Sequence, residues 1–244
     1  MSKALVITGG SRGIGHCTAI GAAKQGWDVC VNYVSNSARA DETVALIEKD
    51  GGKALAVQAD ITKEADVIRL FKDCADQLGE IGGLVNSAGI AEPYGRIDEL
   101  KYDELTYLID INVNAALIVA REGIRHMSPH HGGHGGAIVL LSSVASRLGA
   151  PGNNVPYAAS KGAIDSLGWG LAQEVSREGI RVNVVSPGLI DTEIQPPGRV
   201  EQMGPSLPAG RAGKPEEVAN AILWLLSDDA SYVSGSNINV SYAR

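Results

Sequence analysis

The sequence predicts an α/β protein with a doubly wound, mostly parallel sheet of seven strands and helices on both faces, formed as a single domain over residues 1–244. Short β-branched apolar runs alternate with longer helical patterns along the chain, as in parallel strands joined by crossover helices. The runs are apolar throughout rather than alternating, as expected for strands covered on both faces. No linker rich in Pro, Gly and Ser separates two cores, and no internal repeat occurs.

The strands are expected at the apolar runs, because Val, Ile and Leu favour strands and each run has an ordinary strand length. In chain order the runs are Ala4–Ile7, Asp28–Tyr33, Ala54–Asp60, Gly83–Asn86, Ala137–Ser142, Ile180–Ser186 and Asn237–Val240.

Helices are expected in the intervening stretches, over about 13–25, 38–52, 63–79, 102–127, 154–177 and 216–227. The second of these is amphipathic and ends in two glycines, which suit a helix C-terminus. Two further stretches, 128–136 and 189–215, are expected as loops. The second is long and rich in Pro and Gly, which predicts an active-site lid over about 189–214.

Composition excludes several classes of protein. The net charge is −7 and no basic run occurs, so nucleic acid is not an expected partner. The three cysteines, Cys17, Cys30 and Cys74, lack C-x-x-C spacing and are expected as buried thiols in a reducing compartment. No apolar segment is long enough for a signal peptide or a membrane span. We therefore expect a cytoplasmic protein.

The histidines of "HHGGHGG", which are His130, His131 and His134, lie in a glycine-rich stretch without neighbouring carboxylates or thiolates. This composition is typical of a solvated loop, and no metal site is expected there.

The turn after the first strand reads "TGGSRGIG" and contains Gly9, Gly13 and Gly15. Backbone N–H groups of such a turn and the N-terminus of the following helix both favour a bound pyrophosphate. Glycine permits the tight turn and the close approach of the phosphates. The position of this turn after the first strand favours nucleotide binding over a simple strand–helix connection.

A second motif, "YAASK", contains Tyr157 and Lys161, which share one face of a helix at this spacing. A nearby ammonium is expected to lower the pKa of a tyrosine, which can then exchange a proton with a substrate oxygen. Taken alone, this pair also fits an ordinary amphipathic helix. The serines of "LLSSVAS" end a predicted strand at the carboxyl edge of the sheet, where open α/β sheets bind ligands.

Together these motifs resemble the short-chain dehydrogenase/reductase family. The T-G-x-x-x-G-x-G, V-N-S-A-G, D-I-N-V-N-A, Y-x-x-x-K and P-G-x-I-x-T segments occur in order along essentially the whole chain. The chain is similar overall to glucose-dehydrogenase-like and 3-oxoacyl-carrier-protein-reductase-like members. The resemblance implies a Rossmann-type domain that binds NAD(H) or NADP(H) and an oxidoreductase that acts on a small carbonyl or alcohol.

The resemblance also implies residue roles. Tyr157 would be the general acid/base, and Lys161 would lower its pKa and bind the nicotinamide ribose. Ser143, with Ser142 as the alternative, would hold the substrate oxygen. Asn112 would support a proton relay, although an asparagine there can equally satisfy a buried backbone group. The residues expected to bind the cofactor are Gly9, Ser11, Arg12, Gly13, Ile14, Gly15, Asn32, Tyr33, Asp60, Ile61, Asn86, Ala88, Gly89, Tyr157, Lys161, Pro187, Gly188, Ile190 and Thr192.

The chain departs from the family pattern in three places. Ser87 replaces the second asparagine of V-N-N-A-G, the segment between Ser143 and Tyr157 is one residue longer than usual, and the chain finishes "VSYAR". These departures leave open one hydrogen bond that supports the sheet or the cofactor ribose, the local loop before Tyr157, and details of assembly.

The end of the second strand indicates the cofactor. Asn32 and Tyr33 occupy the region where NAD-binding domains usually carry an acidic residue for the ribose 2′-hydroxyl. Without a carboxylate, a 2′-phosphate is not repelled, and Arg12 supplies a cation for it. Arg39 either reaches the same position or lies on a solvated helix face. NADP(H) is favoured, and NAD(H) or dual use stays open.

The sequence therefore predicts an enzyme that transfers hydride between NADP(H) and a carbonyl/alcohol substrate. The alternative is a dinucleotide-binding sensor or scaffold without activity, for which loss of Tyr157 or Lys161 is expected, and both are present. The resemblance implies a homo-oligomer, either a tetramer or a dimer. Tyr94 and Met203 are expected in the wall of the substrate pocket.

Overall fold

The computed structural model describes residues 3–243 and contains one sheet of seven parallel strands in the order β3-β2-β1-β4-β5-β6-β7. The sheet order reverses between β1 and β4, so the loops after these strands diverge at the carboxyl edge and leave room for a ligand. The predicted doubly wound sheet is confirmed. The strands are β1 (Ala4–Thr8), β2 (Asp28–Tyr33), β3 (Ala54–Gln58), β4 (Ile81–Asn86), β5 (Gly136–Leu141), β6 (Ile180–Pro187) and β7 (Asn237–Val240).

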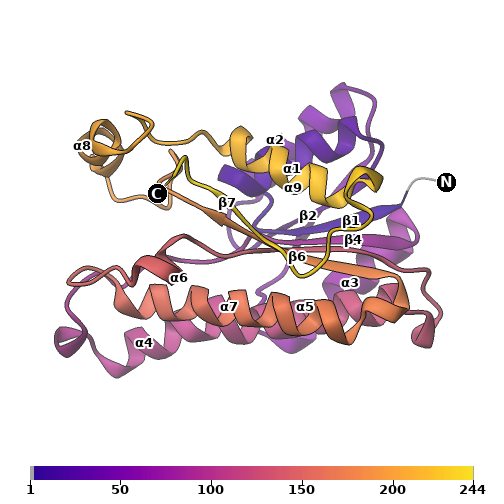
Figure 1. The fold of residues 1–244 in the computed structure, drawn as a ribbon. Coiled ribbons are helices and arrows are strands. Elements are labelled where there is room, and N and C mark those ends of the chain that lie inside the picture. Colours follow the sequence, from indigo (N-terminus) through magenta and orange to yellow (C-terminus); the bar gives the residue numbers. More distant parts are fainter. Residues whose placement is uncertain (1–2, 244) are drawn as a thin grey trace.

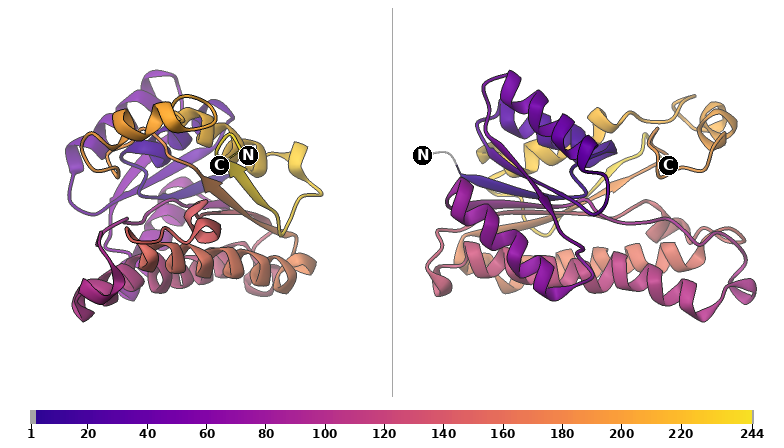
Figure 2. Two further views of the ribbon diagram at one scale, coloured as in Figure 1. Left: turned by 60° about the vertical axis from the view of Figure 1, so that its left-hand side comes forward. Right: turned by 180° about the vertical axis from the view of Figure 1, so that it is seen from behind.

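Helices cover both faces of the sheet (Figure 1). Those near the N-terminus are α1 (Gly13–Lys24), α2 (Ser37–Lys49) and α3 (Glu64–Leu78). The others are α4 (Tyr102–Ile109), α5 (Ala115–Met127), α6 (Ala145–Leu148), α7 (Val155–Glu174), α8 (Arg199–Met203) and α9 (Pro215–Leu226). Helices α1, α2 and α9 lie on one face and α3, α5 and α7 on the other, as both views in Figure 2 also show.

Strand β1 explains why the strand runs are apolar without alternation. Ala4 and Val6 belong to the core beneath α3, α5 and α7, whereas Leu5 and Ile7 belong to the core beneath α1, α2 and α9. All four side chains are fully buried. Each burial contributes roughly 1–3 kcal/mol for a large aliphatic side chain, so both faces of the strand stabilise the sheet.

The helix expected over 102–127 differs from the prediction in its middle. Helices α4 and α5 are joined by a π-helical turn over Asp110–Asn114. Such turns widen the helix by one residue and are frequent at functional sites. Apolar periodicity does not reveal them, because the residues on both sides keep helical spacing.

Residues 189–214, which the sequence predicts to be a lid and which are called the lid below, begin and end on paired backbone. Ile190 and Gly213 form a parallel bridge, the Asp191 amide donates to the Gly213 carbonyl at 2.9 Å, and the Gly213 amide donates to the Leu189 carbonyl at 2.9 Å. Helix α8, which the sequence analysis did not predict, projects with the lid beyond the carboxyl edge of the sheet (Figure 1).

Cys30 and Cys74 are buried as expected, but Cys17 is only partly buried. Its thiol donates to a carboxylate oxygen of Glu216 at 3.5 Å. Burial and the Glu216 charge raise the pKa of Cys17 to about 11. Cys17 is therefore a protonated thiol at the start of α1 at neutral pH.

His134 lies in the glycine-rich loop, with its ring Nδ1 3.3 Å from Glu80. Within residues 3–243 no group of three or more histidine, cysteine or acidic side chains is arranged to hold a metal ion. In the same part of the chain, no helix combines the length and the apolar character needed to span a bilayer.

Candidate active site

The turn between β1 and α1 requires its glycines. Gly9 and Gly13 have φ of +64° and +54°, in the left-handed region that glycine adopts freely. A Cβ on Gly15 would lie 2.3 Å from the Gly9 carbonyl oxygen. The turn therefore folds tightly under the first turn of α1.

No side chain caps the N-terminus of α1, and the flanking Ser11 and Ile14 are partly exposed. The first amides of a helix have no intrahelical acceptor and attract anions. This backbone cradle fits the pyrophosphate of a dinucleotide.

The end of β2 carries no carboxylate. Asn32 is buried, and its side-chain amide donates to the Ala59 carbonyl at 3.0 Å and, more weakly, to the Val57 carbonyl. This side chain therefore supports the β2–β3 edge. Tyr33, the last residue of β2, is partly exposed beside it.

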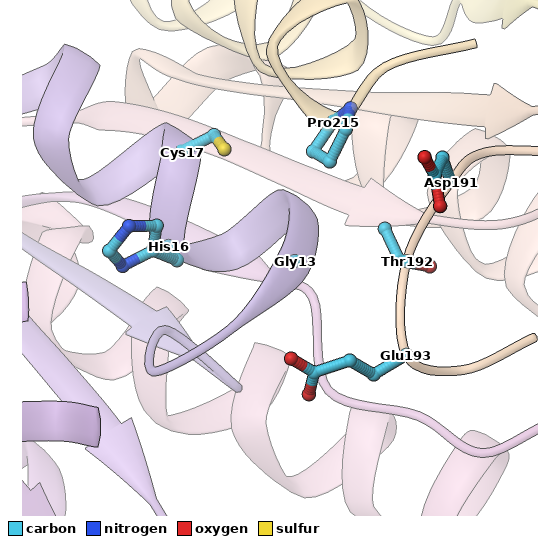
Figure 3. Close-up of a pocket in the computed structure, with 7 residues that line it drawn as sticks. All are labelled: Gly13, His16, Cys17, Asp191, Thr192, Glu193 and Pro215. Carbon is cyan, nitrogen blue, oxygen red and sulfur yellow. The ribbon is translucent and has the colours of Figure 1, made fainter. Parts of the chain in front are cut away.

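Two arginines lie near this edge, and both face the same acidic side chain. The carboxylate of Glu193, on the lid, forms an ion pair with Arg39 and lies 4.0 Å from Arg12. Figure 3 shows Glu193 directed from the lid toward the glycine turn. A cavity of about 450 Å³ lies where the start of α1 meets the start of the lid, and Gly13 and Thr192 both line it.

The end of β3 is shaped by Asp60. Its carboxylate accepts hydrogen bonds from the Thr62 hydroxyl at 2.7 Å and the Thr62 amide at 3.1 Å. These bonds lower the pKa of Asp60, so it is ionised at neutral pH. Asp60 remains partly exposed, and Ile61 beside it is buried.

The ends of β1 and β4 are joined where the sheet order reverses. The Thr8 hydroxyl donates to Asn86 Oδ1 at 2.8 Å and accepts from the Ala88 amide at 3.2 Å. A Cβ on Gly89 would lie 3.1 Å from Asn112 Oδ1 and 3.4 Å from Lys161 Nζ. The segment after β4 therefore passes directly beside two of the predicted catalytic side chains.

Asn112 lies in the π-helical turn and is buried. Its Oδ1 accepts from the Ile90 amide at 2.9 Å, and its Nδ2 donates to the Ile90 carbonyl at 2.9 Å and to Ser160 Oγ at 3.1 Å. The side chain thus satisfies the backbone of the loop after β4, which is the simpler of the two roles considered for it. The π-helical turn brings it to α7 as well.

Helix α7 carries Tyr157 and Lys161 on one face. Its N-terminus is capped by Asn154, whose side chain accepts from the Tyr157 amide at 3.3 Å and also donates to the Ala91 carbonyl. Lys161 is buried, and its Nζ donates to the Leu141 carbonyl at 2.9 Å and lies 5.7 Å from the centroid of the Tyr157 ring.

The two candidate serines have different surroundings. Ser143 and Tyr157 line the same cavity, which has a volume of about 780 Å³. Ser142 is buried, and its hydroxyl donates to the Lys161 carbonyl at 3.0 Å. This geometry favours Ser143 as the serine that faces a substrate.

The pKa values differ from the sequence expectation. Burial raises the pKa of Tyr157, and a hydrogen bond with the Ser143 hydroxyl and the charge of Arg199 oppose that rise only in part. Burial lowers the pKa of Lys161 to about 8. The pKa of Tyr157 thus lies above its ordinary value although the Lys161 ammonium is one helical turn away. Tyr157 therefore holds its proton at neutral pH.

The segment after β6 completes the site. The Gly188 amide donates to the Val240 carbonyl at 3.0 Å, just after Pro187. Ile190 is buried, and the Thr192 methyl lies beside Gly13. The fold thus brings the P-G-x-I-x-T segment against the glycine turn (Figure 3).

Three functional residues of this region were not predicted from the sequence. Asn154 precedes a helix with proline near its start, a recognisable capping pattern. Glu193 and Arg199 gave no such signal, because their importance depends on contacts across the fold.

The comparisons with known proteins agree with this architecture. Residues 9–242 match the family model described as "Enoyl-(Acyl carrier protein) reductase". The chain is 47% identical over 240 residues to the uncharacterized oxidoreductase YgfF of Escherichia coli (strain K12), covering 97% of each chain. It is 35% identical to glucose 1-dehydrogenase 2 of Bacillus subtilis (strain 168), over 98% of this chain and 93% of that protein.

Among solved structures, a short chain dehydrogenase from Burkholderia cenocepacia J2315 in complex with NADP superposes with a TM-score of 0.91. The two sequences are 32% identical, and the match covers 99% of this chain and 96% of that one.

Proposed function

The chain belongs to the short-chain dehydrogenase/reductase family of oxidoreductases, and we propose that it transfers hydride between NADP(H) and a small carbonyl/alcohol substrate. One observation carries this proposal. Ser143 and Tyr157 line one cavity, and buried Lys161 lies one helical turn beyond Tyr157. That is the arrangement needed to bind a carbonyl oxygen and give it a proton.

When bound, the reduced nicotinamide supplies the hydride that adds to the carbonyl carbon. The Tyr157 hydroxyl gives its proton to the carbonyl oxygen, so that the C=O bond becomes C–OH. The Ser143 hydroxyl donates a hydrogen bond to the same oxygen and stabilises the charge that develops there. In the oxidative direction Tyr157 takes the proton back. Lys161 is proposed to hold the nicotinamide ribose, and Asn112 to support return of a proton from solvent.

Burial raises the pKa of Tyr157, which suits its proposed role as the proton donor when a carbonyl is reduced. A general acid must hold its proton before it can give it away, and burial keeps this phenol protonated. Oxidation of the alcohol needs the phenolate, which this environment disfavours.

NADP(H) is the proposed cofactor because Arg12 and Arg39 lie beside a β2 end that carries no carboxylate. A guanidinium forms bidentate hydrogen bonds with a phosphate, whereas an acidic residue at the end of β2 would repel the phosphate. The Burkholderia relative bound to NADP is consistent with this choice. Use of NAD(H) is the alternative that the experiment distinguishes.

The test is a panel of ketones, aldehydes and sugars, each with NADPH and NADH, followed by the absorbance of the reduced nicotinamide. The Tyr157→Phe variant is expected to lose roughly 100-fold or more in kcat while its Kd for NADPH stays unchanged. Tyr107→Phe, on the exposed surface of α4, is the matched control. A Tyr157→Phe protein that reduces carbonyls at the parent rate contradicts the proposal. No consumption of either cofactor favours the sensor or scaffold alternative.

We further propose that the protein works as a cytoplasmic homo-oligomer, either a tetramer or a dimer. Large apolar side chains on α5, α7 and α9 support this, since Leu117, Trp169 and Trp224 are 46%, 60% and 41% exposed. Such surfaces are typical of contacts between subunits. Light scattering on the purified protein measures the mass directly.

A further inference from the structure

The larger cavity has one charged side chain in its wall. Of the described residues that line it, only Arg199 carries a formal charge. The rest of the lid side is contributed largely by apolar groups, including Leu189, Ile194 and Met203. A single cation among apolar and neutral polar groups needs an explanation, because a charge in such surroundings is costly unless it is paired.

Arg199 has no acidic partner within the described part of the chain. Other arginines of this part of the chain do form ion pairs, as Arg211 does with Glu217. The Nε of Arg199 is shielded from solvent and has no hydrogen-bond partner, and no other buried side-chain nitrogen or oxygen among residues 3–243 is left in this way. Buried polar groups are nearly always hydrogen-bonded, so the Arg199 guanidinium keeps hydrogen-bonding capacity that the protein does not use.

The guanidinium also lies near the reacting groups. Its carbon is 5.7 Å from the centroid of the Tyr94 ring, and Tyr94 lines the same cavity. The positive charge of Arg199 lowers the pKa of Tyr157 and so opposes the rise that burial causes. A molecule that presents a carbonyl to Tyr157 and Ser143 therefore has Arg199 within the same cavity.

We propose that the substrate is an oxo acid or hydroxy acid whose carboxylate binds Arg199 while its carbonyl or hydroxyl faces Tyr157 and Ser143. This inference rests on the proposed oxidoreductase function. A carboxylate matches the planar fork of a guanidinium and brings one negative charge to one positive charge. A phosphate monoester would bring nearly two charges, for which this cavity has a single cation. The apolar lid side chains suit the aliphatic chain between the two polar ends.

The experiment compares three keto acids of increasing length, each as the free acid and as its ethyl ester: pyruvate, acetoacetate and 4-oxopentanoate. The full-length protein with NADPH is expected to prefer at least one free acid over its ester by about 10- to 100-fold in kcat/KM. Arg199→Met is expected to remove that preference by lowering kcat/KM for the free acid. Arg147→Met, an exposed arginine of α6 that is not part of the cavity wall, is the matched control.

Inhibition by unreactive carboxylates gives a readout apart from the preference between substrates. Butyrate and pentanoate are expected to inhibit the enzyme competitively with the ketone, whereas the corresponding amides are not. Arg199→Met is expected to lose this inhibition while its Kd for NADPH is retained, which shows that the variant is folded.

The possible failures are distinguishable. Equal or better turnover of the esters, or a preference that survives in Arg199→Met, overturns the carboxylate assignment and leaves the oxidoreductase proposal intact. A further comparison uses dihydroxyacetone phosphate and dihydroxyacetone. If the ratio of their kcat/KM values exceeds the ratio for every acid and its ester, the ligand of Arg199 is a phosphate and not a carboxylate. Absence of both turnover and carboxylate inhibition, with neutral carbonyls still reduced, also contradicts the inference. Tyr157→Phe separately tests the oxidoreductase proposal.

Discussion

The carboxylate of Glu193 on the lid forms an ion pair with the guanidinium of Arg39 at the start of α2. The same carboxylate lies 4.0 Å from Arg12 in the glycine turn. These two arginines are the cations proposed to bind the 2′-phosphate of NADP(H). Glu193 therefore competes with the cofactor phosphate for both arginines. An acidic residue with this effect is usually expected at the end of β2, and Glu193 is far from that position in the sequence.

Glu193→Gln removes this competing charge. We expect the variant to bind NADPH roughly two- to five-fold more tightly, since exposed ion pairs contribute little, and to bind NADH as the parent does. Fluorescence titration of both cofactors measures the two Kd values. A gain of equal size for NADH would show that the lid changed in some other way.

Arg12→Ala is expected to weaken NADPH binding by about ten-fold and to leave NADH binding nearly unchanged. A charge-assisted hydrogen bond to the 2′-phosphate is lost, and only NADPH carries that group. The same titration serves, with Arg96→Ala as a control because Arg96 pairs with Asp98 away from this region. An unaltered ratio of the two affinities would contradict the assignment of Arg12.

Lys161→Met is expected to stabilise the fold at neutral pH and to lower activity. The folded-state pKa of Lys161 is about 8, below the ordinary value of 10.5, so between these values the unfolded chain binds more protons. Below pH 8 the buried ammonium costs about 3 kcal/mol, and the lost bond to the Leu141 carbonyl offsets about 1 kcal/mol of the gain.

Thermal unfolding measured at several pH values checks this expectation. The advantage of the methionine variant is expected to shrink as the pH rises from 8 towards 10.5, because the parent then loses the buried charge. A variant that is less stable than the parent at pH 7, by a margin independent of pH, would contradict it.

Gly15→Ala is expected to abolish tight cofactor binding. The added methyl group would lie 2.3 Å from the Gly9 carbonyl oxygen, so the turn beneath α1 must open. Gly170→Ala in α7 is the matched control, since a Cβ there meets nothing within 4 Å and alanine favours a helix interior by roughly 1 kcal/mol. Isothermal titration with NADPH and thermal unfolding separate the two outcomes.

The strands and most helices were predictable because their signals are local. A strand buried on both faces must be apolar at every position, as Leu5 and Val6 illustrate, and no distant residue alters that requirement. The glycine turn and the Tyr157–Lys161 pair were found for a similar reason, because the residues that act together lie within one or two helical turns.

Features that depend on three-dimensional contact were not predictable. Glu193 and Arg39 meet from positions 154 residues apart, so neither position alone suggests the pair. The lack of an acidic partner for Arg199 among the described residues depends on which side chains the fold brings across the cavity. Helix α8 is too short, and too closely flanked by proline and glycine, for its periodicity to be recognised.

The backbone bridge between Ile190 and Gly213 has a consequence for how such an enzyme changes its substrate. It brings the two ends of residues 191–212 side by side, so the segment forms a loop that is closed at its base. Exchange of that segment for the equivalent one of a relative would alter the cavity wall without disturbing the strands. The part of this loop that lines the cavity, between Ile194 and Met203, can therefore differ between relatives while Ser143, Tyr157 and Lys161 stay in place.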